Sequence, residues 1–453
     1  MQTPKKYKVL SLFSGGMGLD LGLEATGRFE TVACIEKMPT FCETIRLNQK
    51  RGRLPKNLKV IEADISQLSP EAALSRLGLR AEDIDVIVGG PPCQSFSTAG
   101  KRGTTQDPRG TLLWDFLRFV EHIKPKFFLM ENVRGLLSAA LKHRPIAERP
   151  EKGGLPLSED EMPGSVVRLF ASDLANFDTA GYHLDIYEVN AVNYGAPQIR
   201  ERVLFIGNRY NIEVEFPAPT HSQTIRSDIS GTQAGLFEQL PLKSWKTLGD
   251  AISDLRETNP TVLDFSPRKK RYLEMIPPGS NWRSLPEELQ KESMGKAWFA
   301  KGGRSGWWRR LTFDLPCPTL VTMPNHASTA LCHPTETRAL SIREYARIQE
   351  FPDDWEFYGA TSEQYTQVGN AVPTRLGMVA GNVLADNLTK VTDSELKPTA
   401  ASSSEPRIVY LQSHVRTRQW FKNGKVIIWD DDEENGGAAY GAPKTIKKIR
   451  GLR

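Results

Sequence analysis

The chain has 453 residues, of which 39% are hydrophobic and 25% charged, with 36 glycines and 30 prolines. This is ordinary globular composition, and it excludes a disordered, collagen-like or coiled-coil chain. The length allows two or three domains that each bury a core. No apolar run approaches the ~18 residues of a membrane span, and the run after Lys8 is too short for a secretory signal. We therefore expect a cytoplasmic protein.

The number of cysteines and the net charge further limit the class of protein. The five cysteines are odd in number and form no CxxC pair, which argues against a disulfide framework or a structural zinc site. Four of them, Cys34, Cys42, Cys317 and Cys332, are interpreted as small buried hydrophobes. The net charge is +5, and residues 405–453, with ten Lys/Arg against six Asp/Glu, supply +4 of it. A polyanion would therefore have to bind to local patches of basic residues.

Short β-prone runs alternate with helix-compatible segments along the first part of the chain. The first run ends in the turn Gly15-Gly16-Met17-Gly18, after which a helix begins. Such alternation predicts a doubly wound, mostly parallel sheet with helices on both faces. Helical periodicity returns at 341–351 and 373–388. The predicted strands lie at 7–14, 31–36, 60–64, 84–90, 127–131, 182–189 and 203–206.

Polar residues stand at the ends of four of these strands. Glu36, Asp64 and Glu131 end strands, and Cys93 follows one directly. Because the carboxyl ends of parallel strands line the crevice where ligands bind, we expect these side chains to converge on one cleft. Glu36 and Asp64 could equally well cap the helices that follow them.

Composition divides the chain into a large domain and a smaller inserted one. We assign residues 1–210 to the first domain, with a polar, aperiodic surface insertion at 138–165. Proline, tryptophan and basic residues replace the strand–helix repeats over 211–335, which predicts a second domain. Residues 336–390 would return to the first domain, and 391–453 would form a linker and a tail. A solvated tail and a basic DNA-contacting tail are equally compatible with this composition.

The sharpest local signal is Gly89-Gly90-Pro91-Pro92-Cys93-Gln94-Ser95-Phe96-Ser97. Two glycines and two prolines fix a turn that holds the cysteine at a strand end. A free cysteine is only a few per cent thiolate near neutral pH, so a nucleophilic role for Cys93 needs help from its surroundings.

Five motifs in fixed order carry a family resemblance. They are Phe13-Ser-Gly-Gly-Met-Gly18, Pro91-Pro-Cys93, Glu131-Asn-Val133, Gln198-Ile-Arg-Glu-Arg202 and Gln367-Val-Gly-Asn-Ala-Val-Pro373. Over roughly residues 7–210 and 310–388 the chain resembles the bacterial type of DNA (cytosine-5)-methyltransferase. The resemblance implies a Rossmann-like catalytic domain with a smaller target-recognition domain at 211–335.

The resemblance implies the following catalytic roles. Cys93 matches the nucleophile that adds to C6 of cytosine, and Glu131 matches the acid that shares or donates a proton at the ring. Arg202 would hydrogen-bond the cytosine carbonyl oxygen, and Arg200 would buttress the base pocket. Since alternate residues of a strand project to one face, Gln198 would act together with both arginines. A surface salt-bridge ladder is the alternative for this last motif.

The resemblance also implies a site for S-adenosylmethionine, with S-adenosylhomocysteine as product. The glycine turn would approach the ligand by its backbone, and Glu36 would bind its ribose. Met17 stands where the family commonly has glycine, which places the exact turn in question. The histidines are too scattered for a metal site, so we expect no metal. The expected cofactor residues are Phe13, Ser14, Gly15, Gly16, Gly18, Glu36, Asp64, Ile65, Leu112 and Asn370.

Double-stranded DNA is the partner that the resemblance implies. The target base would be flipped out, and the segment 98–106 would close over it as a lid. Residues 281–310 hold seven Lys/Arg against three Asp/Glu with four interleaved tryptophans, which suits phosphate contact, although core packing is the alternative for each tryptophan. The expected DNA contacts are Gln94, Ser95, Ser97, Arg304, Arg309 and Arg310.

Three other functions are less well supported. An RNA cytosine methylase would usually show Cys-Phe-Thr after Pro-Pro, where this chain has Gln94 after Cys93. A catalytically silent homologue would have lost its nucleophile or acid, and a nicotinamide dehydrogenase would need Gly-x-Gly-x-x-Gly. We expect a monomer of a restriction–modification or defence system, or a solitary methylase, associated with the nucleoid when bound to DNA.

Overall fold

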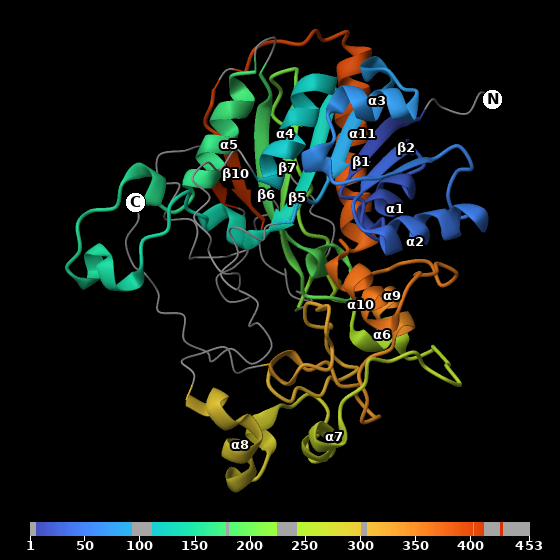
Figure 1. The fold of residues 1–453 in the computed structure, drawn as a ribbon, viewed down its shortest axis with the longest axis vertical. Helices are drawn as coiled ribbons and strands as arrows, with labels where there is room; N and C mark the ends of the chain where they lie inside the picture. The colour runs from blue at the N-terminus through green and yellow to red at the C-terminus, as the bar shows by residue number, and fades with distance from the viewer. Residues whose placement is uncertain are drawn as a thin grey trace, which may run out of the picture.

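A nine-stranded sheet carries the fold (Figure 1). The computed structural model describes residues 6–92, 111–177, 181–223, 242–299, 306–401, 403–411 and 426–428. The strand order is β11-β10-β6-β7-β5-β4-β1-β2-β3, and β7 alone runs antiparallel to its neighbours β5 and β6. The predicted doubly wound, mostly parallel sheet is confirmed. The strands are β1 (Tyr7–Leu12), β2 (Phe29–Glu36), β3 (Lys59–Glu62), β4 (Val86–Gly89), β5 (Phe127–Val133), β6 (His183–Asn190), β7 (Glu201–Asn208), β10 (Arg407–Tyr410) and β11 (Val426–Ile428).

Helices cover both faces of this sheet, and a second group lies beyond its carboxyl edge. The first face is covered by α3 (Pro70–Leu77), α4 (Leu112–Ile123) and α5 (Ser165–Ala175). The opposite face is covered by α1 (Gly18–Glu24) and α11 (Thr374–Asp393). The other helices are α2 (Pro39–Lys50), α6 (Leu248–Ile252), α7 (Pro267–Glu274), α8 (Glu287–Met294), α9 (Ile342–Ile348) and α10 (Thr361–Asn370), and a two-stranded ladder joins β8 (His221–Ser222) to β9 (Lys243–Ser244). No helix among the described residues is long and apolar enough to cross a bilayer.

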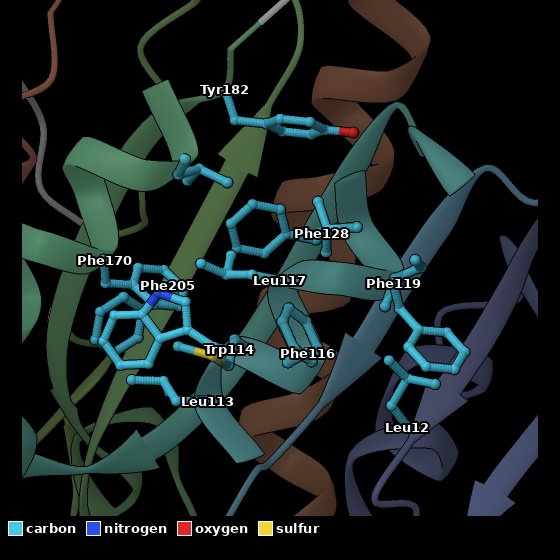
Figure 2. Close-up of a cluster of buried hydrophobic side chains, with 14 of the residues drawn as sticks. Leu12, Leu113, Trp114, Phe116, Leu117, Phe119, Phe128, Phe170, Tyr182 and Phe205 are labelled. Carbon is cyan, nitrogen blue, oxygen red and sulfur yellow. The ribbon is translucent and has the colours of Figure 1, made fainter. Parts of the chain in front are cut away.

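The core under α4 is dominated by aromatic rings (Figure 2). Phe116 of α4 packs edge-on against Phe128 of β5, with ring centroids 5.8 Å apart. Phe170 of α5 meets Phe205 of β7 in the same way at 5.7 Å. Fully burying such a side chain contributes roughly 1.5–3 kcal/mol, so this layer fixes the strands whose ends carry the polar residues.

Glycines set the contact between α1 and α11 on the other face. A Cβ at Gly22 would lie 2.3 Å from the Thr374 oxygen and 2.6 Å from the Gly377 Cα. A Cβ at Gly18 would lie 2.2 Å from the Val372 oxygen. Because side chains at these positions would clash with backbone, the two helices approach closely only through glycine. The glycine turn is thereby held against the Gln367–Pro373 motif.

The first strand of the expected tail belongs to the sheet. Arg407 of β10 is 2% exposed and forms an ion pair with Asp185 of β6, which is fully buried. The Arg407 guanidinium also donates to the Tyr187 hydroxyl at 2.6 Å and to the Val214 carbonyl. Residues 407–410 therefore extend the sheet in parallel with β6, and they do not form a solvated terminus.

A separate lower lobe, defined here as residues 265–339, has its own small apolar core at the bottom of Figure 1. Tyr272 and Leu273 of α7 pack there with Trp282 and Trp308. This cluster shares no member with the clusters on either face of the sheet. Other buried residues of the second predicted segment, such as Leu248, Leu311 and Leu320, belong instead to the cluster around α9 and α10, so the boundaries of that domain stay a prediction.

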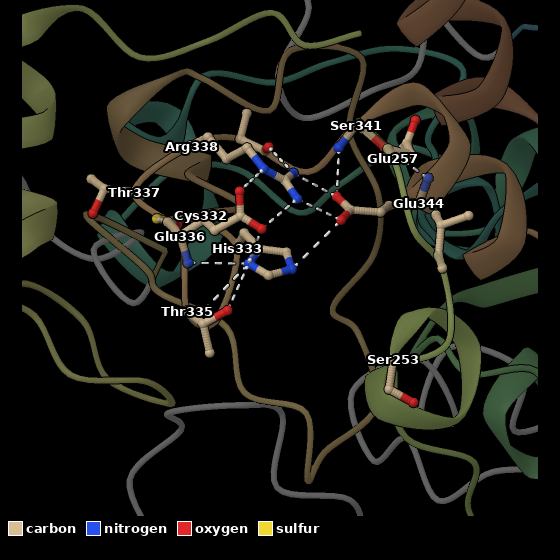
Figure 3. Close-up of polar contacts among 12 residues, drawn as sticks. Ser253, Glu257, Cys332, His333, Thr335, Glu336, Thr337, Arg338, Ser341 and Glu344 are labelled. Carbon is tan, nitrogen blue, oxygen red and sulfur yellow. Dashed lines mark hydrogen bonds and ion pairs between the residues drawn. The ribbon is translucent and has the colours of Figure 1, made fainter. Parts of the chain in front are cut away.

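A buried polar network joins the lower lobe to α9 (Figure 3). Glu344 is 4% exposed and accepts two hydrogen bonds from Arg338, at 2.8 and 2.9 Å, and one from the Ser341 backbone N–H at 2.6 Å. His333 lies 3.5 Å from the same carboxylate through its Nε2. Burial lowers the pKa of His333, so the neutral imidazole is favoured in this network.

Candidate active site

The turn after β1 uses left-handed backbone at three alternate residues. The φ angles are 56° at Phe13, 53° at Gly15 and 65° at Met17. Glycine adopts this conformation freely, whereas methionine is strained by about 1–2 kcal/mol. Met17 is fully buried in the core near α9 and α10, which contributes roughly 1.5–3 kcal/mol and offsets that strain. The departure from the common glycine therefore leaves the turn itself intact.

Glu36 holds this turn in place. Its Oε2 accepts the Gly15 N–H at 2.9 Å, and its Oε1 accepts the Met38 N–H at 2.9 Å at the start of α2. The side chain lies at the end of β2 and is 7% exposed. Glu36 thus caps the start of α2, which was the alternative to a ligand-binding role. Each of its carboxylate oxygens retains a lone pair that can accept a further hydrogen bond.

Asp64 lies beside Glu36 at the next strand end. The Ala63 N–H donates to the Glu36 carbonyl, which brings the two strand ends together. Asp64 forms an ion pair with Lys37 at 2.7 Å and accepts two hydrogen bonds from Ser66. These donors lower the pKa of Asp64 to about 2, so the carboxylate is an acceptor throughout the neutral range. Sequence reasoning missed Lys37, whose only signal was its place after Glu36.

The other expected cofactor residues differ in exposure. Ile65 is 3% exposed beyond Asp64, and Leu112 begins α4 half-buried. Asn370 ends α10 with an exposed side chain. The remaining members belong to the turn after β1, where Phe13 and Gly15 are half-buried and Ser14, Gly16 and Gly18 are buried.

The Gly-Gly-Pro-Pro turn is fastened to the end of β5. The Asn132 side chain donates to the Pro91 carbonyl at 3.0 Å. A Cβ on Gly90 would lie 3.1 Å from Glu131 Oε2, so the turn passes directly over that carboxylate. Cys93 follows Pro91 by two residues. Cys93, Gln94, Ser95, Ser97 and the expected lid at 98–106 lie outside the described residues.

Glu131 and Arg202 form the central charged pair. The Arg202 Nε lies 2.5 Å from Glu131 Oε1, and both side chains are 12% exposed. Glu131 of β5 is paired with Leu204 of β7, two residues beyond Arg202, so both side chains emerge on the same face of the antiparallel ladder. The pair places an acid and a fixed cation next to the Pro91 turn.

Arg200 and Gln198 lie outside this pair, which corrects the expectation of one continuous strand face. β7 begins only at Glu201, so period-two alternation does not extend back to them. Arg200 is 1% exposed and donates to the Gly369 carbonyl at 2.9 Å and the Asn370 carbonyl at 3.3 Å. Gln198 donates to the buried Gln349 side chain at 2.8 Å. Both residues therefore tie the Arg202 strand to the Gln367–Pro373 motif.

Gln349 is a second residue that sequence reasoning missed. Its amide nitrogen donates to the Val368 and Ala371 carbonyls at 2.7 and 2.9 Å, and its side-chain oxygen accepts from Gln198. It is fully buried at the end of α9. A polar residue within an apolar helical pattern was the signal available.

The residues expected to contact DNA differ in how far they are buried. Arg310 is 8% exposed, and its guanidinium donates to the Leu273, Ile276 and His333 carbonyls and to the Thr337 hydroxyl. A buried guanidinium needs hydrogen-bond acceptors inside the protein, and Arg310 finds them in the lower lobe. Arg310 therefore stabilises this lobe and is not exposed for DNA contact. Arg309 is half-buried, and Arg304 lies outside the described residues.

The four other cysteines are unsuited to nucleophilic chemistry. All are buried, as predicted, and burial raises the pKa of Cys42 and Cys317 to about 12 and of Cys332 to about 11. Burial also raises the pKa of the Cys34 thiol far above its ordinary value. Within the described ranges, no group of three His, Cys, Asp or Glu side chains could hold a metal ion, and the absence of a metal requirement stays a prediction.

Comparisons with known proteins agree with this geometry. The model of the C-5 cytosine-specific DNA methylase family matches residues 7–385. The chain is 36% identical over 386 residues to the type II methyltransferase M.Sau96I of Staphylococcus aureus, covering 85% of this chain and 77% of that protein. It is also 36% identical over 389 residues to M.Eco47II of Escherichia coli, covering 85% and 80%.

A solved structure has a similar fold. It is a DNA modification methyltransferase encoded within a prophage of Escherichia coli, with a TM-score of 0.52 and 22% identity over 85% of this chain and 100% of that one. The strand-end acids, the Glu131–Arg202 pair and the extent of the family match lead to one conclusion. The chain belongs to the C-5 cytosine-specific DNA methylase family, whose members are S-adenosylmethionine-dependent enzymes.

Proposed function

We propose that the protein methylates carbon 5 of a flipped-out cytosine in a specific duplex DNA sequence, through a covalent adduct between Cys93 and C6. The observation that carries the proposal is the Glu131–Arg202 pair directly beneath the Gly90-Pro91 turn. Cys93 follows Pro91 by two residues in the sequence, and it is the residue that we propose to act with this acid.

The remaining cysteines support Cys93 as the nucleophile. Each of the other four is buried, and burial raises its pKa. A thiol of that kind supplies almost no thiolate at neutral pH. In the sequence, Cys93 alone follows a Gly-Gly-Pro-Pro turn at a predicted strand end.

The chemistry assigns a role to each residue of the pair. The Cys93 thiolate bonds to C6 while Glu131 steadies or protonates N3, so that C5 gains the electron pair it needs. Arg202 neutralises the charge that develops on the exocyclic carbonyl oxygen of cytosine. S-adenosylmethionine, when bound, supplies the methyl group that C5 takes up. Loss of the C5 proton to a base then expels the Cys93 sulfur and restores the aromatic ring.

The strand-end acids fit the cofactor. Ribose hydroxyls and an adenine amino group are donors, and Glu36 and Asp64 present acceptor oxygens side by side at the ends of β2 and β3. Phe13, Ile65 and Leu112 supply apolar surface for the adenine ring. The backbone of Gly15 and Gly16 allows close approach at the turn.

We further propose that residues 211–335 recognise the target sequence, while Gln94, Ser95, Ser97, Arg304 and Arg309 contact DNA. Extruding the target base costs a few kcal/mol, and closure of the 98–106 lid would offset that cost. In this proposal a monomer works on cytoplasmic DNA at the nucleoid, within a restriction–modification system or alone. Its relatives are type II methyltransferases, which favours the first context.

The deciding experiment is base-resolution methylation mapping of host DNA, with and without expression of this chain. We expect one cytosine of a fixed motif to become modified. Cys93→Ser should abolish turnover and leave duplex and S-adenosylmethionine binding intact, because the thiolate is the one group that bonds to C6. Near-normal turnover of Cys93→Ser would refute the covalent mechanism, and a mark found only in RNA would refute the DNA substrate.

Exchange of residues 211–335 for the matching segment of M.Sau96I tests recognition separately. We expect the modified motif to follow the donor segment, because base readout depends on the side chains of that segment. Sequencing of methylated DNA measures the motif. A fold-preserving chimera that kept the original motif would refute the assignment of recognition to this segment.

A further inference from the structure

A second charged cluster lies at the end of the β5–β7 ladder, and the proposed chemistry assigns it no role. The Arg134 Nε lies 3.0 Å from Glu201 Oε2 and 3.8 Å from Glu188 Oε1. Glu188 is fully buried in β6, whereas the Arg134 and Glu201 side chains are 29% and 26% exposed. Arg134 directly follows the Glu131–Val133 motif, and Glu201 lies within the Gln198–Arg202 motif. The cluster therefore adjoins two of the motifs on which the proposed reaction depends.

Strand register places this cluster behind the Glu131–Arg202 pair. β7 lies between β6 and β5 in the sheet (Figure 1). Glu188 of β6 is paired with Val203, and Val203 and Glu201 are the two neighbours of Arg202 in β7. Because successive residues of a strand alternate between faces, Glu188 and Glu201 lie on the face opposite Arg202 and Glu131. The Glu131–Arg202 pair and the cluster are therefore back to back at the same strand ends.

Glu201 connects the two faces through its own backbone. The Arg202 guanidinium donates from Nη1 to the Glu201 carbonyl at 2.6 Å, while its Nε lies 2.5 Å from Glu131 Oε1. A planar guanidinium that is held at two of its nitrogens keeps one orientation. The Glu201 side chain is in turn held by Arg134. Two ion pairs, Glu131–Arg202 and Arg134–Glu201, are thus joined into a closed ring by the chain from 131 to 134 and by the 201–202 peptide.

The β5–β7 ladder ends beside Arg202, so its backbone alone holds this point weakly. The last residue pair of the ladder is Val133 with Arg202. β5 ends at Val133 and continues as a 3-10 helix over Arg134–Ser138, and β7 begins at Glu201. The ends of an element open more readily than its centre. An ion pair between Arg134 and Glu201, immediately beyond the last backbone pair, restricts that opening.

We propose that Arg134 is a positioning residue for methyl transfer, an inference that rests on the proposed function. By holding the Glu201 side chain, Arg134 fixes the Glu201 carbonyl and hence the Arg202 guanidinium against Glu131. Arg202 then meets the cytosine carbonyl oxygen in one orientation, while Arg134 itself touches neither the base nor the cofactor. A displacement of about 1 Å at reacting groups can lower a rate about a hundredfold, so a contact one residue away controls the reaction through geometry.

Arg134→Gln tests this role, with Arg28→Gln as a matched control. Arg28 also pairs with a carboxylate of another element, Asp386 of α11, and its side chain is 34% exposed. It precedes β2, so it lies at the amino edge of the sheet, away from Glu131. At saturating DNA and S-adenosylmethionine, kcat should fall roughly tenfold to a hundredfold in Arg134→Gln and stay unchanged in Arg28→Gln. Both variants should keep the wild-type KM for DNA and for S-adenosylmethionine.

A double-mutant cycle separates positioning from general support. Glu201→Gln should lower kcat as much as Arg134→Gln, and the double variant should lower it no further, because both substitutions break the same contact. Arg134→Lys keeps the charge and should recover a large part of kcat. Two effects that multiplied in the double variant would overturn the proposal. A merely structural Arg134 would also overturn it, since its loss would lower Tm while kcat per folded molecule stayed unchanged.

A crystal structure of Arg134→Gln gives a readout that needs no activity. The Arg202 guanidinium should leave the Glu201 carbonyl and turn away from Glu131, and an Arg202 that stayed in place would refute its positioning by Arg134. A higher KM for DNA and a smaller salt slope with unchanged kcat would instead make Arg134 a phosphate contact. A wild type that methylated no DNA would refute the proposed function, and the position of Arg202 in the variant would still decide the contact.

Discussion

The sheet and the lower lobe place their functional groups by different means. In the sheet, buried strands such as β1 and β4 fix their neighbours through continuous backbone ladders, and the polar residues stand at their ends. In the lower lobe, two eight-residue helices and irregular segments surround a small core, so surface charges depend on loops and ion pairs. In the proposed function, chemistry belongs to the sheet and recognition to the lower lobe, a division that would allow target specificity to change while the reaction is kept.

The buried ion pair between Arg407 of β10 and Asp185 of β6 tests whether β10 unfolds together with the sheet. Arg407→Met should lower the free energy of unfolding by about 3–5 kcal/mol, because it leaves Asp185 charged, buried and without its partner. Arg80→Met is the control, since Arg80 pairs with Asp83 on the surface and such pairs contribute about 1 kcal/mol or less. Urea unfolding measures both. Equal effects would show that β10 is not part of the cooperative sheet.

Asp20 of α1 makes the stability of the protein depend on pH, and the sign of this dependence follows from its pKa. Burial raises the pKa of Asp20 from 3.8 to about 7. Between these values the native state holds a proton that the unfolded state has released, so stability falls as pH rises from about 4 to 7. Asp20→Asn should therefore be more stable than the wild type by a few kcal/mol at pH 8 and similar to it at pH 4.

Thermal unfolding of both proteins across this range checks the sign. Asp83→Asn provides the opposite case, because a hydrogen bond from the Arg80 backbone lowers the pKa of Asp83. That variant should lose a little stability above pH 4. A wild type whose stability rose between pH 4 and 7 relative to Asp20→Asn would contradict the burial of a protonated Asp20.

The polar network in Figure 3, which joins the lower lobe to α9, tests how strongly the stability of the lower lobe is coupled to that of the sheet. Glu344→Gln should cost about 1–3 kcal/mol, less than Arg407→Met, because Arg338 keeps Glu336 at 2.9 Å. Hydrogen exchange should rise around residues 272–285 of the lower lobe and stay unchanged in β4 and β5. Equal loss of protection in both regions would mean that they unfold as one unit.

Residue spacing predicted well wherever one regular element carried the pattern. The alternation of apolar runs located β1 to β7, and strand ends predicted Glu36, Asp64 and Glu131 at one edge. The expected strand face was wrong at Gln198 and Arg200, because the chain becomes a strand only at Glu201, although the Arg200 guanidinium still donates to the Gln198 side-chain oxygen at 3.4 Å. Sequence reasoning also failed at Arg310, since charge in a sequence does not distinguish a surface arginine from one that satisfies buried carbonyls.

The sequence by itself determined the fold class and the order of the motifs, because each depends on local periodicity or on residues within one turn. Only the tertiary structure decided which side chains meet. Arg202 reaches Glu131, Arg200 reaches Gly369, and Arg407 joins Asp185 from 222 residues away. Such contacts depend on strand register and on the packing of segments distant in the chain, and these are set by the burial of the whole core.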